Sequence, residues 1–222
     1  LSKNIHEEEP PQDLQEIALA GNRAQPELCQ ITQTVSAAQN AVILNEIAWM
    51  GTAVSTSREW VELKNISGYP INIKNWQLLD KDKQIKVIFP EDRELAVNAF
   101  FLLERTSDNS VPLTPADLIY QGALNDTNET LYLFDVNCQL QDKAVAGPNW
   151  PAGDKDNKKT MERSADFSWH TFSGQPQQGI YGTPKKENSM PIDENVPPAT
   201  PSPAPTPSPT PTPAPPDKIL IT

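Results

Sequence analysis

The stretch Arg58-Glu59-Trp60-Val61-Glu62-Leu63-Lys64-Asn65 alternates in side-chain character from one residue to the next, as β-strands do. Val61 and Leu63 point to one face of such a strand, whereas Glu62 and Lys64 point to the other. A strand with one apolar face must pack it against a neighbour, and the apolar run Ala41 to Trp49 lies just upstream. We therefore predict that the two segments form neighbouring strands, joined by a loop at Met50 to Ser57.

Further short apolar runs follow, with turns between them at intervals of about ten residues. They lie at Trp76 to Leu79, Gln84 to Phe89, Phe100 to Arg105, Asp117 to Tyr120, Thr130 to Asp135, Leu140 to Ala146, Thr160 to Arg163 and Ser168 to Phe172. The pattern predicts an all-β protein, a two-sheet antiparallel β-sandwich. Parallel pairing would need crossover helices, and the sequence contains no convincing helix. The four apolar residues that open the Phe100 run predict burial on both faces.

Proline separates the folded part of the chain from its flanks. The chain has 222 residues, 23 prolines and a net charge of −11, and 12 of the prolines lie between Pro191 and Pro216. We expect a disordered leader over residues 1–40, one domain over 41–188 and a Pro/Thr/Ser-rich linker over 189–217. A tract that alternates proline with small residues cannot build a core and favours an extended spacer.

The last residues of the chain are apolar again. The run Asp-Lys-Ile-Leu-Ile-Thr at 217–222, with 218–222 as the possible start of a domain, echoes the run at 40–45. We expect that they begin a second, similar domain, a tandem copy that continues beyond Thr222.

Composition argues against several classes of protein. Residues 41–187 contain 20 acidic and 15 basic residues and no basic run, so we expect no binding to nucleic acid. The sequence has no apolar run of transmembrane length. It also lacks a glycine-rich phosphate loop and zinc-ligand spacing, and we expect no cofactor and no metal as a structural requirement.

With the strands placed, the chain resembles the lamin-tail domain family, whose fold is immunoglobulin-like. The resemblance rests on Val61 to Ser67 together with Asn75-Trp76-Gln77-Leu78, and on five further motifs in the same order along the chain. These are Leu44 to Ile47, Phe101 to Thr106, Trp150 to Asp154, Thr160 to Arg163 and the closing Gly182 to Asn188. Several of them are similar to the bacterial branch of the family. The segment before Val42 lacks the heptad repeats of nuclear lamins.

The resemblance implies a non-catalytic module of a secreted or cell-surface multidomain bacterial protein, used for binding, spacing or attachment. Its partner would be a protein or a cell-surface component, and its location extracellular, with the cytoplasm as the alternative. A second reading makes it an accessory module of an extracellular nuclease or phosphatase encoded in the same protein or nearby. Neither reading makes this chain an enzyme.

Two glutamates on the first predicted pair of strands are candidate catalytic residues. Glu46 and Glu62 could form a carboxylate pair for acid-base work, which needs a cleft and shifted pKa values. Exposed strand faces carry glutamate routinely, however, with Lys64 or Arg105 as cross-strand partners. We favour this second reading.

Three aspartates are candidate calcium ligands. Asp142, Asp154 and Asp156 lie in or beside the predicted loop at Gly147 to Lys159, and calcium prefers oxygen ligands on flexible loops. The loop lacks the glycine and the distal glutamate of the helix-loop-helix calcium pattern.

The histidines and tryptophans give less evidence of a functional site than the acidic residues do. His6 lies in the leader and His170 beside Trp169 in a late strand, where we interpret it as packed or superficial rather than as a general base. Trp76 is a predicted core residue, and Trp150, in a loop, is the candidate for surface contact.

The two cysteines leave two alternatives open. A bridge between Cys29 and Cys138 would stabilise the fold by about 4–5 kcal/mol through loop closure. Because Cys29 lies in the polar leader, outside the predicted domain, two unrelated thiols are the other reading.

Overall fold

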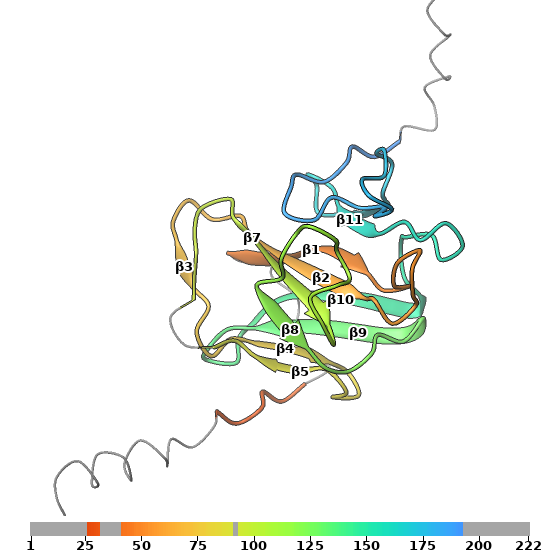
Figure 1. Cartoon of the computed structure of the whole chain (residues 1–222). Coiled ribbons are helices and arrows are strands. Elements are labelled where there is room, and N and C mark those ends of the chain that lie inside the picture. Colours follow the sequence, from red (N-terminus) through yellow and green to blue (C-terminus); the bar gives the residue numbers. More distant parts are fainter. Residues whose placement is uncertain (1–25, 32–40, 91–92, 193–222) are drawn as a thin grey trace, which may run out of the picture. The chain divides into compact units, whose positions relative to one another are not determined.

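The computed structural model describes residues 26–31, 41–90 and 93–192, and within them it contains twelve strands and no helix. One sheet has six strands, in the order β12 (Trp169–Thr171), β11 (Met161–Arg163), β1 (Val42–Ala48), β2 (Trp60–Asn65), β7 (Phe100–Arg105) and β8 (Leu118–Tyr120). The other has four, in the order β10 (Leu140–Asn149), β9 (Thr127–Phe134), β4 (Gln77–Asp80) and β5 (Lys86–Ile88). The strands β3 (Ile71–Asn72) and β6 (Glu94–Leu95) form a small ribbon (Figure 1). The predicted all-β, immunoglobulin-like sandwich is confirmed.

Most of the predicted flanks lie outside the described residues. This holds for nearly all of the leader, for most of the 189–217 linker and for residues 218–222. The boundaries of the domain and the tandem copy therefore stay predictions.

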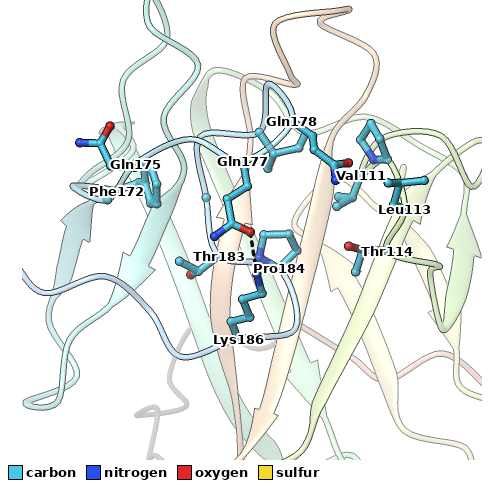
Figure 2. Close-up of a pocket in the computed structure, with 14 residues that line it drawn as sticks. Val111, Leu113, Thr114, Phe172, Gln175, Gln177, Gln178, Thr183, Pro184 and Lys186 are labelled. Carbon is cyan, nitrogen blue, oxygen red and sulfur yellow. Dashed lines mark hydrogen bonds between the residues drawn. The ribbon is translucent and has the colours of Figure 1, made fainter.

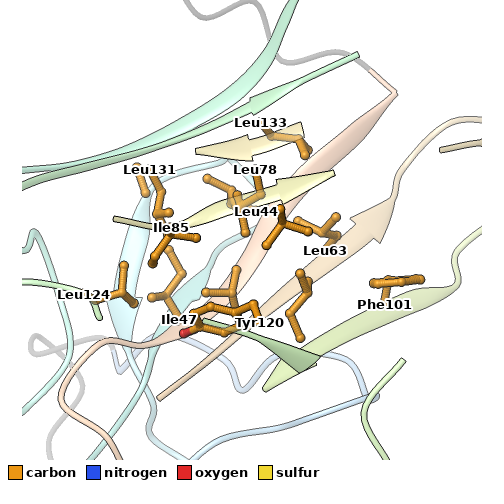
Figure 3. Packing of buried hydrophobic residues seen from close by; sticks show 14 of the residues in the cluster. Leu44, Ile47, Leu63, Leu78, Ile85, Phe101, Tyr120, Leu124, Leu131 and Leu133 are labelled. Atoms are coloured by element: carbon orange, nitrogen blue, oxygen red, sulfur yellow. The ribbon is translucent and has the colours of Figure 1, made fainter. Parts of the chain in front are cut away.

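The inner faces of the two sheets meet in one hydrophobic core. The predicted pairing of β1 with β2 is confirmed, and Val61 and Leu63 of β2 are fully buried in this core. Figure 3 shows Leu44 and Leu63 of the six-stranded sheet together with Leu78, Leu131 and Leu133 of the four-stranded one. Burying one such side chain contributes roughly 1.5–3 kcal/mol, and this gain holds the layers together.

The outer face of the six-stranded sheet is covered as well. A second apolar cluster lies there, made of Ala48, Trp60, Leu102, Val111 and Ile180. Phe101 and Leu103 of β7 belong to the main core, whereas Leu102 belongs to this outer cluster. The prediction that this strand is buried on both faces is confirmed, and the outer face is not a solvent-facing surface.

A β-bulge in β1 reorients its side chains. Pairing with β2 shifts between Leu44 and Glu46, so that both Asn45 and Glu46 lie on the outer face while Leu44 and Ile47 stay in the core. Bulges often redirect a side chain in this way. The backbone N–H of Leu44, beside the bulge, donates to the Asp142 carboxylate at 2.9 Å.

The same carboxylate joins the two sheets. Asp142 on β10 accepts two hydrogen bonds from Nη2 of Arg163 on β11, at 2.8 and 2.9 Å, and both side chains are buried. Arg163 also donates to the carbonyl groups of Leu44 and Phe167. Because a buried charge needs a partner, this ion pair fixes β10 against the edge of the six-stranded sheet.

One edge of the sandwich differs from the prediction. Strand β8 pairs with β7 in parallel, with Leu103 opposite Leu118, so the expectation of purely antiparallel pairing was wrong there. The connection over residues 106–117 contains no helix. The buried Glu104 carboxylate instead holds this loop by accepting from the N–H groups of Ser110 and Val111, at 2.6 and 3.2 Å. A three-residue edge strand needs no helical crossover.

The two cysteines form a disulfide, so the reading as unrelated thiols was wrong. Cys29 does not lie outside the fold: it is 2% exposed and packs with Leu79, Phe134 and Leu140. The Gln77 side chain accepts from Cys29 N at 2.9 Å and donates to Glu27 O at 2.8 Å. The sequence gives no sign of this contact, because the partners lie about 50 residues away along the chain.

The disulfide generates a first prediction. Replacing Cys29 and Cys138 together by serine should lower the free energy of unfolding by about 2–5 kcal/mol, because the bridge closes a loop of 109 residues. Urea unfolding of the full chain measures the loss. The wild-type chain under reducing conditions serves as the control and should lose as much. Equal stability of the oxidised wild type and the variant would contradict the prediction.

The ion pair between the sheets generates a second. Asp142→Asn leaves a buried guanidinium without a counter-ion and should cost about 3–5 kcal/mol of unfolding free energy. The matched control is Asp126→Asn, which breaks the exposed pair with Lys155 and should leave the urea midpoint nearly unchanged. Similar losses in the two variants would show that burial does not set the strength of the Asp142 pair.

Candidate functional site

Three glutamates lie side by side on the outer face of the six-stranded sheet. Glu46 of β1 is opposite Glu62 of β2 on one side and opposite Glu162 of β11 on the other. All three residues are 0% exposed. The expectation that Glu46 and Glu62 lie on exposed strand faces was therefore wrong. Their expected partners differ as well, since Lys64 pairs with Glu187 and Arg105 with Glu59.

A later part of the chain, residues 182–189, covers these carboxylates and is called here the covering segment. Its backbone N–H groups donate to all three: Thr183 N to Glu46 at 2.9 Å, Lys185 N to Glu62 at 2.5 Å and Ser189 N to Glu162 at 3.1 Å. Figure 1 shows this part of the chain, in blue, beside β11. Buried carboxylates must be hydrogen-bonded, and the covering segment supplies the donors.

Close approach of the covering segment depends on a glycine. A Cβ atom at Gly182 would clash with Glu46 Oε1 and with the Thr160 side chain. Thr160 itself donates its hydroxyl to Glu46 at 2.5 Å. Glycine at this position therefore allows the backbone to lie directly on the carboxylate.

Folding raises the pKa of two of these carboxyl groups, Glu46 and Glu62. Burial raises the pKa of Glu46 well above its ordinary value, and the negative charges of Glu162 and Glu62 raise it further. Burial also raises the pKa of Glu62 to about 8, against the hydrogen bonds from Lys185 N and Asn45.

The hydrogen-bond count agrees with a proton on Glu46. The Thr183 hydroxyl lies 2.6 Å from Glu162, 3.1 Å from Glu46 and 3.3 Å from the Asn188 amide oxygen, and it has one hydrogen to donate. Glu162 is the nearest acceptor. When Glu46 is protonated, its O–H can donate to the hydroxyl oxygen of Thr183. Two oxygens that would otherwise both act as acceptors then no longer face each other.

Two cavities lie on either side of the covering segment. The smaller one, of about 360 Å³, is lined by three glutamines, Gln175, Gln177 and Gln178, by apolar groups that include Leu113 and Ile180, and by one charged side chain, Lys186. Lys186 Nζ donates a hydrogen bond of 2.6 Å to Oε1 of Gln177, drawn as a dashed line in Figure 2. Within this cavity the one charged side chain is thus already paired.

The larger cavity, of about 870 Å³, lies between the β11–β12 hairpin and residues 187–191. Trp169 lines it, and the Arg163 guanidinium stacks on the Trp169 ring with its central carbon 3.8 Å from the ring centre. Lys64 and Glu187 form an ion pair at 2.5 Å on its rim. The aromatic ring of Trp169, the cations Arg163 and Lys64 and the amide of Asn188 thus all line one cavity.

The tryptophans are placed differently from the prediction. Trp150, the candidate for surface contact, is 7% exposed, stacks on Trp49 and donates its indole N–H to Asn125 O at 2.9 Å. Trp76 is buried, as predicted. Of the five tryptophans, it is Trp169 that remains half-buried and reaches a cavity. Sequence position does not reveal this, because Trp150 becomes covered by residues distant in the chain.

The structure does not bring the three calcium candidates together. Asp142 is committed to Arg163, and Asp154 accepts from the N–H groups of Asp156 and Asn157 within its own turn. Among the described residues, no group of three or more acidic, histidine or cysteine side chains is arranged to hold a metal ion.

His170 has three partners that the sequence analysis did not identify. Its Nδ1 lies 2.8 Å from Ser164 Oγ, and its Nε2 lies 2.8 Å from Ser189 O and 3.2 Å from Glu162. Pairing of β11 with β12 sets Glu162 opposite His170. A hairpin prediction with the correct register could have found this pair, whereas Ser189 comes from the covering segment and leaves no local signal. His6 lies outside the described residues.

Comparison with known proteins gives one family. The model of the Lamin Tail Domain family matches residues 35–147, half of the chain. No curated protein matches the sequence. The matched region ends within β10, so β11, β12 and the covering segment lie beyond it. Among the described residues there is no helix long and apolar enough to cross a membrane.

The buried carboxylates predict that stability falls as pH rises. An acid whose pKa is raised by folding binds more protons in the folded chain than in the unfolded one, so raising the pH favours unfolding between the two values. For Glu62 this window runs from about 4.5 to about 8. Glu59, whose pKa burial raises to about 7, contributes in the same direction.

We expect the urea midpoint of the full chain to decrease from about pH 5 to about pH 8, and Glu62→Gln to flatten that decrease, because the amide does not titrate. The matched control is Glu94→Gln, an exposed glutamate on β6, which should leave the slope as in the wild type. A midpoint that rises over this range would contradict the assignment of protonated carboxylates.

Proposed function

Because the chain belongs to the lamin-tail domain family, we propose that it is a binding or attachment module of a secreted or cell-surface bacterial protein. Its role is non-catalytic in the sense that it holds a partner for the rest of a multidomain protein. The partner is a protein or another component of the cell surface.

The observation that carries this proposal is the larger cavity. Trp169 offers an aromatic surface there, and the amide of Asn188 and the charged pair of Lys64 and Glu187 offer hydrogen bonds around it. Binding sites combine an apolar surface with a few placed polar groups, and aromatic residues contribute most to affinity. The covering segment forms one wall, so the cavity is built by the fold and not by a loose loop.

The disulfide supports the proposed location. Disulfides persist in secreted and cell-surface proteins and are rare in the reducing cytoplasm. The bond between Cys29 and Cys138 also ties the leader to the folded sheets, as suits a chain exposed to the environment. The proline-rich tract after the domain fits a spacer that holds the module away from its neighbour.

The role as an accessory module of a nuclease or phosphatase depends on residues outside this chain. It predicts a catalytic domain in the same or the adjacent reading frame. Sequencing on both sides of the segment separates the two proposals.

Binding to a cell surface tests the function. Labelled full chain should be retained on cell envelopes of the source organism, and Trp169→Ala should weaken retention about tenfold or more, since it removes an aromatic anchor. The control is Val145→Ala, which truncates a side chain exposed on the four-stranded sheet. Equal retention of both variants would exclude the larger cavity as the contact. Turnover of nucleic acid or phosphoester substrates by the full chain would contradict a non-catalytic role.

A further inference from the structure

The larger cavity contains a serine in contact with a histidine that is in turn held by a buried glutamate. Ser164 follows β11, His170 lies on β12 and Glu162 lies on β11. The three side chains form a continuous series: Ser164 Oγ lies 2.8 Å from His170 Nδ1, and His170 Nε2 lies 3.2 Å from Glu162. We propose that Ser164 is a nucleophile activated by His170, which accepts an acyl or phosphonyl group from an activated ester bound in this cavity.

The direction of the hydrogen bonds follows from a carbonyl group. Ser189 O can only accept, and it lies 2.8 Å from His170 Nε2, so Nε2 carries the hydrogen. In the neutral imidazole, Nδ1 then holds the lone pair. Ser164 must therefore donate its hydroxyl hydrogen to Nδ1. This is the arrangement in which a histidine acts as general base toward a serine.

Glu162 completes the arrangement electrostatically. When Nδ1 takes the hydroxyl proton, the ring becomes an imidazolium, and the buried carboxylate beside Nε2 offers it a negative charge. The two ring nitrogens have exchanged roles relative to the Ser-His-Asp triad, where the base is Nε2. The chemistry needs a base, a held tautomer and a nucleophile, and all three are present.

The Ser164 hydroxyl is not needed to close the hairpin. Backbone hydrogen bonds already close the turn, from Ser164 N to Ser168 O and from Phe167 N to Ser164 O, both at 2.9 Å. In the described part of the chain, no acceptor faces the N–H of Ala165, the residue after the serine. In serine hydrolases the amide after the nucleophile stabilises the oxyanion, so this N–H is a candidate for the same role.

Ser164 and His170 both line the larger cavity and are both partly exposed, so a substrate can reach them. The step balances without another reactant. The Ser164 oxygen forms a bond to the carbonyl carbon or phosphorus atom, the bond to the leaving group breaks, and His170 passes the hydroxyl proton to the leaving group. This single transfer to Ser164 is not turnover, so it goes beyond the non-catalytic binding role proposed above and does not require it.

Labelling with a fluorophosphonate tests the proposal. The probe forms an oxygen–phosphorus bond with an activated serine, fluoride leaves, and the proton passes through the histidine. Full chain should carry one probe per molecule, located at Ser164 by peptide mass spectrometry. Ser164→Ala should abolish the label, and His170→Gln should slow it about hundredfold or more, as loss of a general base does.

Ser168→Ala is the matched control, since Ser168 is an exposed hydroxyl of the same turn, bonded to Asp166, and its loss should leave the rate unchanged. If His170→Gln fails to fold, the wild-type chain alone still tests the proposal. Labelling of Ser164 no faster than that of Ser168 would overturn it. A binding role without this activity would appear as retention on envelopes with no label at Ser164, so the two proposals fail separately.

Discussion

The outer face of the six-stranded sheet depends on one constraint, which is that three neighbouring carboxylates lie out of reach of water. Glu46, Glu62 and Glu162 would be costly to bury without donors, and the covering segment provides them from its backbone. The position of this segment then determines the rest of that face. Ile180, just before this segment, closes the outer apolar cluster, and the segment itself lies between the two cavities. The candidate site therefore depends on the hydrogen bonds that the covering segment donates to the three carboxylates.

The same strands, β1 and β11, are joined to the four-stranded sheet by a different interaction. Where β1 bulges, the Asp142 carboxylate on β10 accepts hydrogen bonds from the Leu44 N–H and from the Arg163 guanidinium. A single carboxylate of the four-stranded sheet thus binds both the backbone of β1 and a side chain of β11. Arg163 also stacks on Trp169 and thereby fixes the wall of the larger cavity. An interaction that joins the two sheets also shapes the candidate binding surface.

The sequence predicts the fold well because the fold is encoded locally. Alternation at Arg58 to Asn65 gives the strand and its core face, and apolar runs give most of the remaining strands, although the short β6 is absent from the prediction. Alternation cannot show what lies over the polar side of a strand. Glu62 looks like a solvent-facing residue, and the segment that buries it follows about 120 residues later. The same limit applies to Cys29, to Trp150 and to the partners of His170, since each is defined by a contact distant in the chain.

The disulfide described above also determines how the molecule would respond to tension. A pull applied at the two ends enters the fold at Cys29 and passes directly through the covalent bridge to Cys138. The chain between them, a sequence separation of 109, is then shielded from the force, and roughly 370 Å of it cannot be drawn out while the bond is intact. Strands β1 to β9 would then carry no tension, and among the strands only β10 to β12, which follow Cys138, would be pulled directly.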